Sequence, residues 1–294
     1  MNISLPLPLE GACDCHVHVY GSKQLYPVKD ESRYSWYDSP VSAHQAFARK
    51  SGISRAVIVQ PSIYGTENHC TLDAAASLQG AGRAVVEIDE NAITDAELDI
   101  MHASGARGVR LTIALAGLPD DSLYQRTVVR IQATALRVAR NNWHIEVMTP
   151  GWLSVRLIPV LRDTGLKYCF GHVAGLRPEM GSVSEEFRAI CSELSRGDRC
   201  YVKLSAFYRL SKLSGYDDLR PILRSLMMDV PTRLLWGTDF PHPKYSAKVT
   251  PEQQLQVLLD SVSDIETLTQ ILVHNPQHFY DFENKDQTAE ARSR

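Results

Sequence analysis

Short apolar runs alternate with longer amphipathic segments along most of this sequence of 294 residues. Each run is apolar at consecutive positions, which is typical of a strand that is buried on both faces of a sheet. The predicted strands span residues 14–19, 55–60, 83–88, 108–113, 144–149, 166–171, 200–205 and 233–236. The pattern therefore predicts eight strands.

A segment with helical periodicity follows each predicted strand. The predicted helices span residues 42–52, 71–79, 94–105, 124–141, 154–164, 184–196, 217–228, 251–261 and 265–273. Two of them begin with the spacing of a capping box, Ser42 to Gln45 and Thr94 to Glu97. Strands that alternate with helices in this way form a parallel sheet. Eight such units favour a closed (β/α)8 TIM barrel over an open sheet.

The sequence contains no linker or shift in composition that would divide the barrel. We therefore expect one domain over residues 1–282, followed by a polar tail over residues 283–294. Residues 20–40 form a long polar segment, rich in tyrosine, after the first strand. A loop of this length inside a compact domain is usually a lid or a binding loop.

Composition and charge argue against several classes of partner. The net charge is −3 and no basic run occurs, so we expect neither nucleic acid nor an anionic membrane as a partner. The first ten residues lack the features of a signal peptide, and no apolar run approaches the roughly 18 residues of a membrane span. The six cysteines form no CxxC pair, which predicts reduced thiols in a cytoplasmic protein. The oligomeric state is left open.

Four polar residues lie within or soon after three of the predicted strands. Asp239 comes directly after the strand at 233–236, where two prolines stop the strand from continuing. His16 and His18 occupy alternate positions of the first strand, so their side chains point to the same face. His172 follows the sixth strand. Because α/β barrels carry their chemistry at the carboxyl ends of the strands, we expect these four side chains to converge.

Three histidines and one carboxylate can support two kinds of chemistry. They could hold a divalent metal, since imidazole and carboxylate are ordinary zinc ligands. Alternatively, Asp239 could activate water as a general base while the histidines polarise a carbonyl group. A single histidine near a core is often only a buried polar residue, but the combination at three strand ends favours a site.

Other polar residues near the strand ends are candidates for substrate binding: Arg110, Arg177, Arg209, Ser62 and Tyr64. Arg110 lies within an apolar strand, where an unpaired cation is costly, so it requires an anion. That anion could be Glu146, for which Lys203 would compete, or a substrate carboxylate held by two hydrogen bonds.

Several motifs, in order along the chain, resemble those of the amidohydrolase superfamily. They are CDCHVH (13–18), VQPS (59–62), GVR (108–110), GH (171–172), KLS (203–205) with RLS (209–211), and WGTDFPHP (236–243). Within the superfamily they resemble the branch of lactonases typified by 2-pyrone-4,6-dicarboxylate lactonase. The match extends from about residue 12 to Tyr280. The resemblance implies a distorted (β/α)8 barrel that opens the ring of a small carboxylated lactone.

The resemblance also implies a role for each candidate. Asp239 would deprotonate the attacking water, and His16, His18 and His172 would polarise the lactone carbonyl. The residues expected to bind substrate are Arg110, Arg209, Arg177, Ser62, Tyr34, Tyr64, Met148 and His242. No cofactor would be required. The alternative is a loosely bound zinc or manganese ion held by His16, His18, His172 and Asp239.

The sequence departs from the family pattern at several positions. Metal-dependent members carry a histidine or carboxylated lysine ligand on the fourth or fifth strand, where this chain has Arg110 and Glu146. The pyrone lactonase has a tyrosine in place of Met148 and an arginine in place of Ala116. These differences predict another lactone, such as a muconate-derived or sugar-acid lactone from the catabolism of aromatic or sugar acids. The alternatives are a metal-dependent decarboxylase or hydratase, a lactone isomerase, or a binding protein without turnover.

Overall fold

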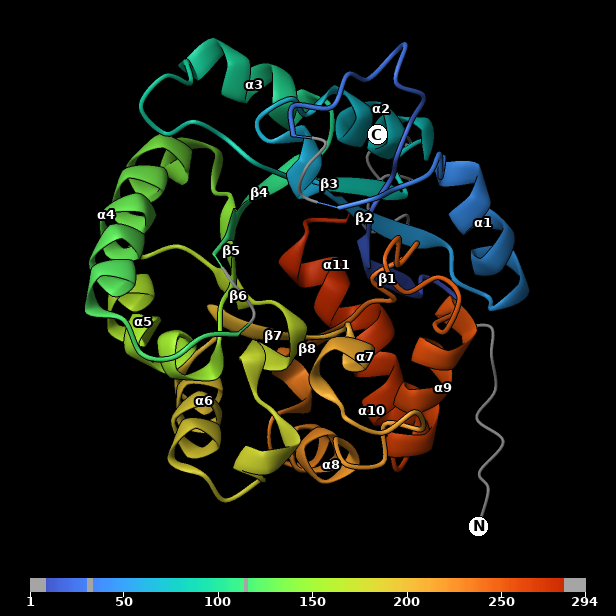
Figure 1. The fold of residues 1–294 in the computed structure, drawn as a ribbon, viewed down its shortest axis with the longest axis vertical. Helices are drawn as coiled ribbons and strands as arrows, with labels where there is room; N and C mark the ends of the chain where they lie inside the picture. The colour runs from blue at the N-terminus through green and yellow to red at the C-terminus, as the bar shows by residue number, and fades with distance from the viewer. Residues whose placement is uncertain (1–8, 31–33, 114–115, 283–294) are drawn as a thin grey trace, which may run out of the picture.

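Eight parallel strands form the centre of the protein in the computed structural model, which describes residues 9–30, 34–113 and 116–282 (Figure 1). They are β1 (Cys13–Val17), β2 (Arg55–Val59), β3 (Gly82–Val86), β4 (Ala106–Thr112), β5 (His144–Met148), β6 (Tyr168–Phe170), β7 (Cys200–Leu204) and β8 (Leu234–Trp236). The strands neighbour one another in the order of the sequence. All eight predicted strands are thus confirmed, each within a few residues of its predicted ends.

The sheet closes where β1 meets the segment that follows β8. The amide of Asp239 donates a hydrogen bond to the carbonyl of His16 at 2.9 Å, and the amide of His18 donates one to the carbonyl of Phe240 at 2.8 Å. A parallel bridge also joins Val17 to Phe240. These contacts nearly complete the barrel, and they confirm the predicted (β/α)8 fold.

Helices surround the strands, as Figure 1 shows. They are α1 (Val41–Lys50), α2 (His69–Ser77), α3 (Asp95–Ala103), α4 (Asp121–Val138), α5 (Gly151–Asp163), α6 (Glu185–Arg196), α7 (Phe207–Leu210), α8 (Arg220–Asp229), α9 (Pro251–Ser261), α10 (Ile265–Thr269) and α11 (Asn275–Phe279). The helix predicted over 265–273 is α10 followed by a π-helical turn, Gln270–His274. The short helix α7 was not predicted, because four residues are too few to show a helical period.

The two predicted capping boxes had different outcomes. Thr94 and Glu97 form a capping box at the start of α3, as predicted. The box predicted at Ser42 is wrong. Helix α1 already begins at Val41, after Pro40, and no side chain caps it. Ser42 therefore lies inside the first turn, where its hydroxyl group is not in the capping position.

Two groups of buried side chains stabilise the barrel. The larger group lies between the strands and the surrounding helices. The smaller group joins residues of β1, β2, β3, β6, β7 and β8 to Phe279, Tyr280 and Phe282 at the end of the described chain. All six cysteines are free thiols. In the described part of the chain, no helix has the length and apolar character needed to cross a membrane. The tail at 283–294 lies outside the described residues.

Candidate active site

A cavity of about 100 Å³ opens at the carboxyl ends of the strands. Its lining includes seven residues that the sequence predicts for the site: His18, Tyr34, Ser62, Arg110, Met148, Arg209 and Asp239. Its other lining residues were not predicted: Tyr20, Thr112, Tyr208, Pro243, Lys244 and Tyr245. The cavity therefore lies at the end of the barrel where α/β barrel enzymes carry their chemistry.

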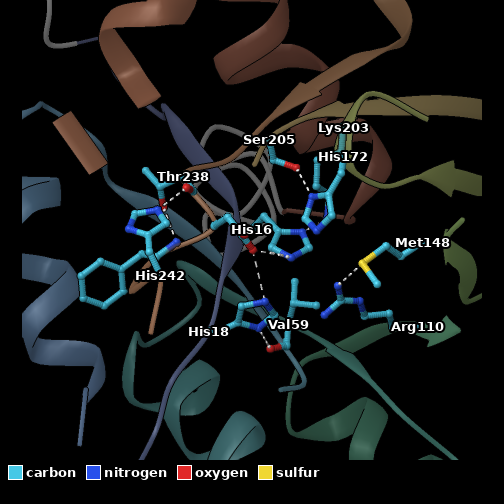
Figure 2. A network of polar contacts seen from close by, with 12 residues as sticks. His16, His18, Val59, Arg110, Met148, His172, Lys203, Ser205, Thr238 and His242 are labelled. Atoms are coloured by element: carbon cyan, nitrogen blue, oxygen red, sulfur yellow. Dashed lines mark hydrogen bonds and ion pairs between the residues drawn. The ribbon is translucent and has the colours of Figure 1, made fainter. Parts of the chain in front are cut away.

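The imidazole rings of His16, His18 and His172 lie next to one another (Figure 2), and the carboxylate of Asp239 contacts two of them. Asp239 Oδ1 lies 3.4 Å from His16 Nε2 and 3.3 Å from His18 Nε2. The ring of His16 is centred 4.9 Å from that of His18 and 5.0 Å from that of His172. All four side chains are almost completely buried. The structure thus brings together the four residues that sequence reasoning expected to converge.

A second contact fixes the orientation of each ring. His18 Nδ1 donates a hydrogen bond to the carbonyl of Val59 at 2.7 Å. His172 Nδ1 lies 2.9 Å from the Ser205 hydroxyl oxygen. His16 Nδ1 lies 3.2 Å from Lys203 Nζ. Each ring is therefore held at Nδ1, His18 from β2 and the other two from β7 and the residue that follows it, and its Nε2 faces the centre of the site (Figure 2).

A buried carboxylate, Asp14, joins β1 to the segment after β8, beside this cluster. It accepts hydrogen bonds from the amide of His16 at 3.1 Å and from the amide and hydroxyl of Thr238 at 3.0 and 2.6 Å. His44 Nε2 lies 2.9 Å from Asp14 Oδ2, the oxygen that also accepts the hydrogen bond from the Thr238 hydroxyl. Gly237 permits the close approach, because a Cβ atom there would lie 2.6 Å from the His16 nitrogen. The relative position of His16 and Asp239 is therefore set by the closure of the barrel.

The backbone is strained at the residues that begin the loops after β6, β7 and β8. His172 has φ of 50°, Ala206 of 53° and Asp239 of 61°. Non-glycine residues rarely adopt these left-handed angles, and each costs of order 1–3 kcal/mol. Such strain is found most often at functional sites, where the surrounding structure holds a side chain in a required direction.

Burial and neighbouring groups control the protonation of the cluster. Burial, aided by the Lys203 ammonium, holds the pKa of His16 well below its usual range. Burial likewise lowers the pKa of His172. Burial alone would raise the pKa of Asp239, but the imidazoles of His172, His18 and His16 outweigh it and hold that pKa well below its usual range. Asp239 is therefore a carboxylate at neutral pH, able to accept a proton.

Tyr208 is a part of this cluster that sequence reasoning missed. Its hydroxyl donates a 2.6 Å hydrogen bond to Asp239 Oδ2, the oxygen atom that does not contact His16 and His18. The ring packs edge-on against His242 and next to Tyr245. Its position directly before Arg209, a predicted site residue, was the available signal.

Arg110 is a buried cation in the wall of the cavity, with 4% of its surface exposed. Its guanidinium lies 3.3 Å from Met148 Sδ and 3.5 Å from the carbonyl of Gln60. Within the described ranges it makes no ion pair with a carboxylate. Glu146, its partner residue in the β4–β5 register, instead pairs with Lys203 at 2.6 Å. The proposed competition for Glu146 is thus decided in favour of Lys203.

Three of the predicted binding residues lie away from the cavity lining. The Tyr64 hydroxyl accepts a hydrogen bond from the amide of Gly21 at 3.2 Å, and the side chain is buried. His242 is also buried. Its Nε2 lies 2.8 Å from the carbonyl of Thr238, and its ring packs edge-on against Tyr208. Arg177 is half-buried in the loop after β6. Periodicity fixes the direction of strand residues but not that of loop residues, which explains these differences.

The donor set of the cluster fits a single divalent metal ion. One ligand atom each from His16, His172 and Asp239 lies within 4.8 Å of the other two. Across the described chain, His16 Nε2, His172 Nε2 and Asp239 Oδ1 have no hydrogen-bond partner. Two imidazoles and a carboxylate are a usual ligand set for zinc.

Curated proteins with similar sequences include enzymes named for lactones. A 4-sulfomuconolactone hydrolase of Hydrogenophaga intermedia is 32% identical, covering 92% of this chain and 88% of that protein. A 2-pyrone-4,6-dicarboxylate hydrolase of Comamonas testosteroni is 29% identical, covering 92% and 90%. A D-galactarolactone isomerase of Agrobacterium fabrum is 24% identical, covering 78% and 77%.

The fold is also shared with solved structures. A probable 2-pyrone-4,6-dicarboxylic acid hydrolase from Acinetobacter baumannii, with citric acid bound, superposes with a TM-score of 0.75 at 23% identity. The superposition covers 92% of this chain and all of that one. The family model described as amidohydrolase matches residues 13–282, which is almost the whole barrel. This chain belongs to the amidohydrolase family.

Proposed function

We propose that this protein is a hydrolase that opens a carboxylated lactone with a water molecule activated by Asp239. One observation carries the proposal: a buried carboxylate surrounded by three imidazoles lines the same cavity as Arg110, a buried cation without a carboxylate partner in the described chain. The first element can activate water beside a carbonyl group, and the second can bind an anionic substituent. The names of the two lactone hydrolases above support the same assignment.

The proposed reaction consumes one water molecule. Asp239 accepts a proton from water as the water oxygen forms a bond to the lactone carbonyl carbon. The histidine cluster stabilises the negative charge that develops on the carbonyl oxygen. The ring C–O bond then breaks, and the proton held by Asp239 is transferred to the departing ring oxygen. The product is the ring-opened acid, which has one carboxylate more than the substrate.

The cavity lining indicates the class of substrate. Arg110 and Arg209 supply positive charge, and hydroxyl groups of Ser62 and Tyr34 supply hydrogen bonds. Met148 adds an apolar surface at the position where the pyrone lactonase has a tyrosine. We therefore propose a small lactone with at least one carboxylate, drawn from 2-pyrone-4,6-dicarboxylate, muconolactones and sugar-acid lactones. A catabolic role in the cytoplasm is consistent with six free thiols.

A metal ion, if bound, would be held by His16, His172 and Asp239, with His18 next to them. Its chemistry would be to polarise a carbonyl oxygen or to acidify a bound water. The residues of the chain perform the remaining tasks in either case: Arg110 binds the anionic substituent, and Asp239 accepts and returns the proton.

Lactone isomerisation is the second candidate function. It is favoured by the relative named D-galactarolactone isomerase. An acid–base group beside a lactone carbonyl can also transfer the acyl group to another hydroxyl of the same molecule, provided that water is excluded. The two reactions differ in their products, because only hydrolysis adds a carboxylate.

The decisive experiment is a lactone panel assayed with protein whose metal content has been measured before and after chelation. The panel contains the three lactone classes named above, and products are identified by NMR. We expect hydrolysis of at least one carboxylated lactone and its loss in Asp239→Asn, with ligand affinity retained. Isomerised product would favour the second function. Turnover of no lactone, with or without added zinc or manganese, would contradict both and would leave a decarboxylase or hydratase.

A further inference from the structure

The two histidines of the first strand have chemically opposite partners at Nδ1. His18 Nδ1 faces the carbonyl oxygen of Val59, which can only accept a hydrogen bond. His16 Nδ1 faces Lys203 Nζ, which as an ammonium group can only donate one. A nitrogen of an imidazole ring carries either an N–H or a lone pair. Nδ1 therefore carries the N–H in His18 and the lone pair in His16.

Lys203 is itself fixed in a fully buried ion pair. It extends from β7 and donates to Glu146 Oε2, on β5, at 2.6 Å. Both side chains have no exposed surface, and Nζ lies 5.8 Å from the ring centre of Tyr280 on its other side. The ion pair with Glu146 therefore holds Lys203 Nζ in place against His16 Nδ1. Neither side chain lines the cavity, and His16 lies between Lys203 and the cavity-lining carboxylate of Asp239.

We propose that Lys203 and Glu146 are positioning residues that hold His16 as the tautomer protonated at Nε2, which makes this ring a hydrogen-bond donor toward the reacting carbonyl. The tautomer assignment concerns the metal-free protein, in which His16 Nε2 is not a ligand, and its catalytic consequence rests on the proposed function. His18 differs from it, because its proton lies at Nδ1. Of the two histidines of the first strand, His16 is the one whose Nδ1 partner directs the proton to Nε2, where it can stabilise a developing oxyanion.

The surroundings of His16 favour this tautomer over the other. Nδ1 could donate to Glu146 Oε1, but that contact is 3.5 Å, longer than the 3.2 Å contact with Lys203. Glu146 Oε1 makes no hydrogen bond within the described residues. On the opposite side of the ring, Nε2 faces the carboxylate of Asp239 at 3.4 Å. A proton on Nε2 satisfies both neighbours, whereas a proton on Nδ1 would oppose the ammonium and present a lone pair to the carboxylate.

The test is ¹⁵N NMR of the imidazole nitrogens in the full chain, with the His16 signals assigned from their absence in His16→Asn. Protonated and unprotonated ring nitrogens resonate in separate regions, so the tautomer is read directly and without any substrate. We expect His16 to be protonated at Nε2 and His18 at Nδ1. Protonation of His16 at Nδ1 in the wild-type protein would overturn the proposal, whatever the outcome of the lactone panel.

A paired variant tests the cause. Glu146→Gln with Lys203→Met removes both charges together, so no unpaired buried charge remains. The amide oxygen introduced by Glu146→Gln can then accept a hydrogen bond from Nδ1, and we expect the proton of His16 to move there. With an active lactone, kcat should fall about 100-fold with little change in KM, as for loss of one oxyanion donor. An unchanged tautomer and kcat in the paired variant would refute the assignment.

The matched control is a second ion pair at the opposite end of the barrel. Arg162 of α5 pairs with the buried carboxylate of Glu193 on α6. The variant Arg162→Met with Glu193→Gln removes this pair and tests for a general loss of stability. It should leave the His16 tautomer and kcat unchanged. If both paired variants lower kcat equally, the effect is structural and the positioning role is excluded.

Discussion

At the scale of single residues, Tyr208 gives the clearest prediction. Its hydroxyl fixes Asp239 Oδ2, which leaves Oδ1 to face His16 and His18. A hydrogen bond to a charged group contributes about 1.5–3 kcal/mol, so Tyr208→Phe should lower kcat by roughly 10- to 100-fold. KM should change less than kcat, because the role proposed for the carboxylate is to activate water rather than to bind substrate. Steady-state kinetics with the best lactone checks this.

The control for Tyr208 has the same chemistry far from the site. Tyr168 also donates a 2.6 Å hydrogen bond to a buried carboxylate, Glu193, at the amino end of β6. Tyr168→Phe should lower the unfolding free energy about as much as Tyr208→Phe does, but it should leave kcat unchanged. Equal kinetic losses in both variants would mean that Tyr208 acts only through stability.

Arg110 leads to a prediction in which activity and stability change in opposite directions. The buried guanidinium has no carboxylate partner in the described chain, so it costs stability in the free enzyme. Arg110→Met should raise the unfolding free energy while kcat/KM for a carboxylated lactone falls about 100-fold or more. An uncharged lactone should lose far less. Urea unfolding and kinetics on the two lactones measure both effects.

A second buried arginine serves as the control for Arg110. Arg83 donates to the backbone carbonyls of Gly82 at 2.8 Å and Asp281 at 2.7 Å, so its charge is well solvated by the protein. Arg83→Met should therefore destabilise the fold and leave substrate preference unchanged. A loss of stability in Arg110→Met would show that this cation has an internal role.

Sequence reasoning at the residue scale succeeded where a strand sets the direction of a side chain. The positions of His16, His172 and Asp239 follow from the ends of apolar runs, and the structure brings them together. The placement of Tyr64 and His242 could not be predicted, because neither lies on a strand and both turn away from the cavity. Tyr208 was missed because it lies on α7, a helix too short to show a period in the sequence.

At the scale of elements, the eight strands were predictable because each is an apolar run buried on both faces. Their closure was expected from the number of units, but the contacts that form it join segments more than 200 residues apart and could not be named from the sequence. Gly237 lies against His16 where those segments meet. A Cβ atom there would lie 2.5 Å from His16 Cβ, a distance that forces the two segments apart.

Gly237→Ala should therefore weaken the closure and disturb the site together. Overpacking in a well-packed core costs typically about 1–3 kcal/mol, and displacement of His16 relative to Asp239 should lower kcat as well. Chemical denaturation and kinetics measure the two losses. Gly197→Ala is the control, since a Cβ there meets no atom within 4 Å and the extended backbone suits any residue. Wild-type behaviour of Gly237→Ala would show that the closure is loose.

At the scale of the whole molecule, the barrel separates a reactive end from a stabilising end. Asp239 and its histidines lie at the carboxyl ends of the strands, whereas His144 begins β5 at the amino ends. The His144 ring packs against Phe279 and Tyr280, at 4.4 and 5.3 Å between ring centres. His144 is the first residue of the strand predicted over 144–149, and that position places it at the end of the barrel away from the site.

This position makes His144 a source of acid sensitivity. Burial, with a smaller contribution from Lys203, holds the pKa of His144 well below 6.5, its ordinary value. Below pH 6.5 the unfolded chain therefore binds a proton that the folded chain excludes, so the unfolding free energy falls as the pH falls. It should fall by about 1.4 kcal/mol per pH unit for this proton, until the pH reaches the folded-state pKa. Above pH 6.5 the contribution is constant.

His144→Leu should remove this part of the dependence, so that urea midpoints of variant and wild type converge between pH 8 and pH 5. Parallel curves over that range would mean that the folded protein accommodates a charged His144.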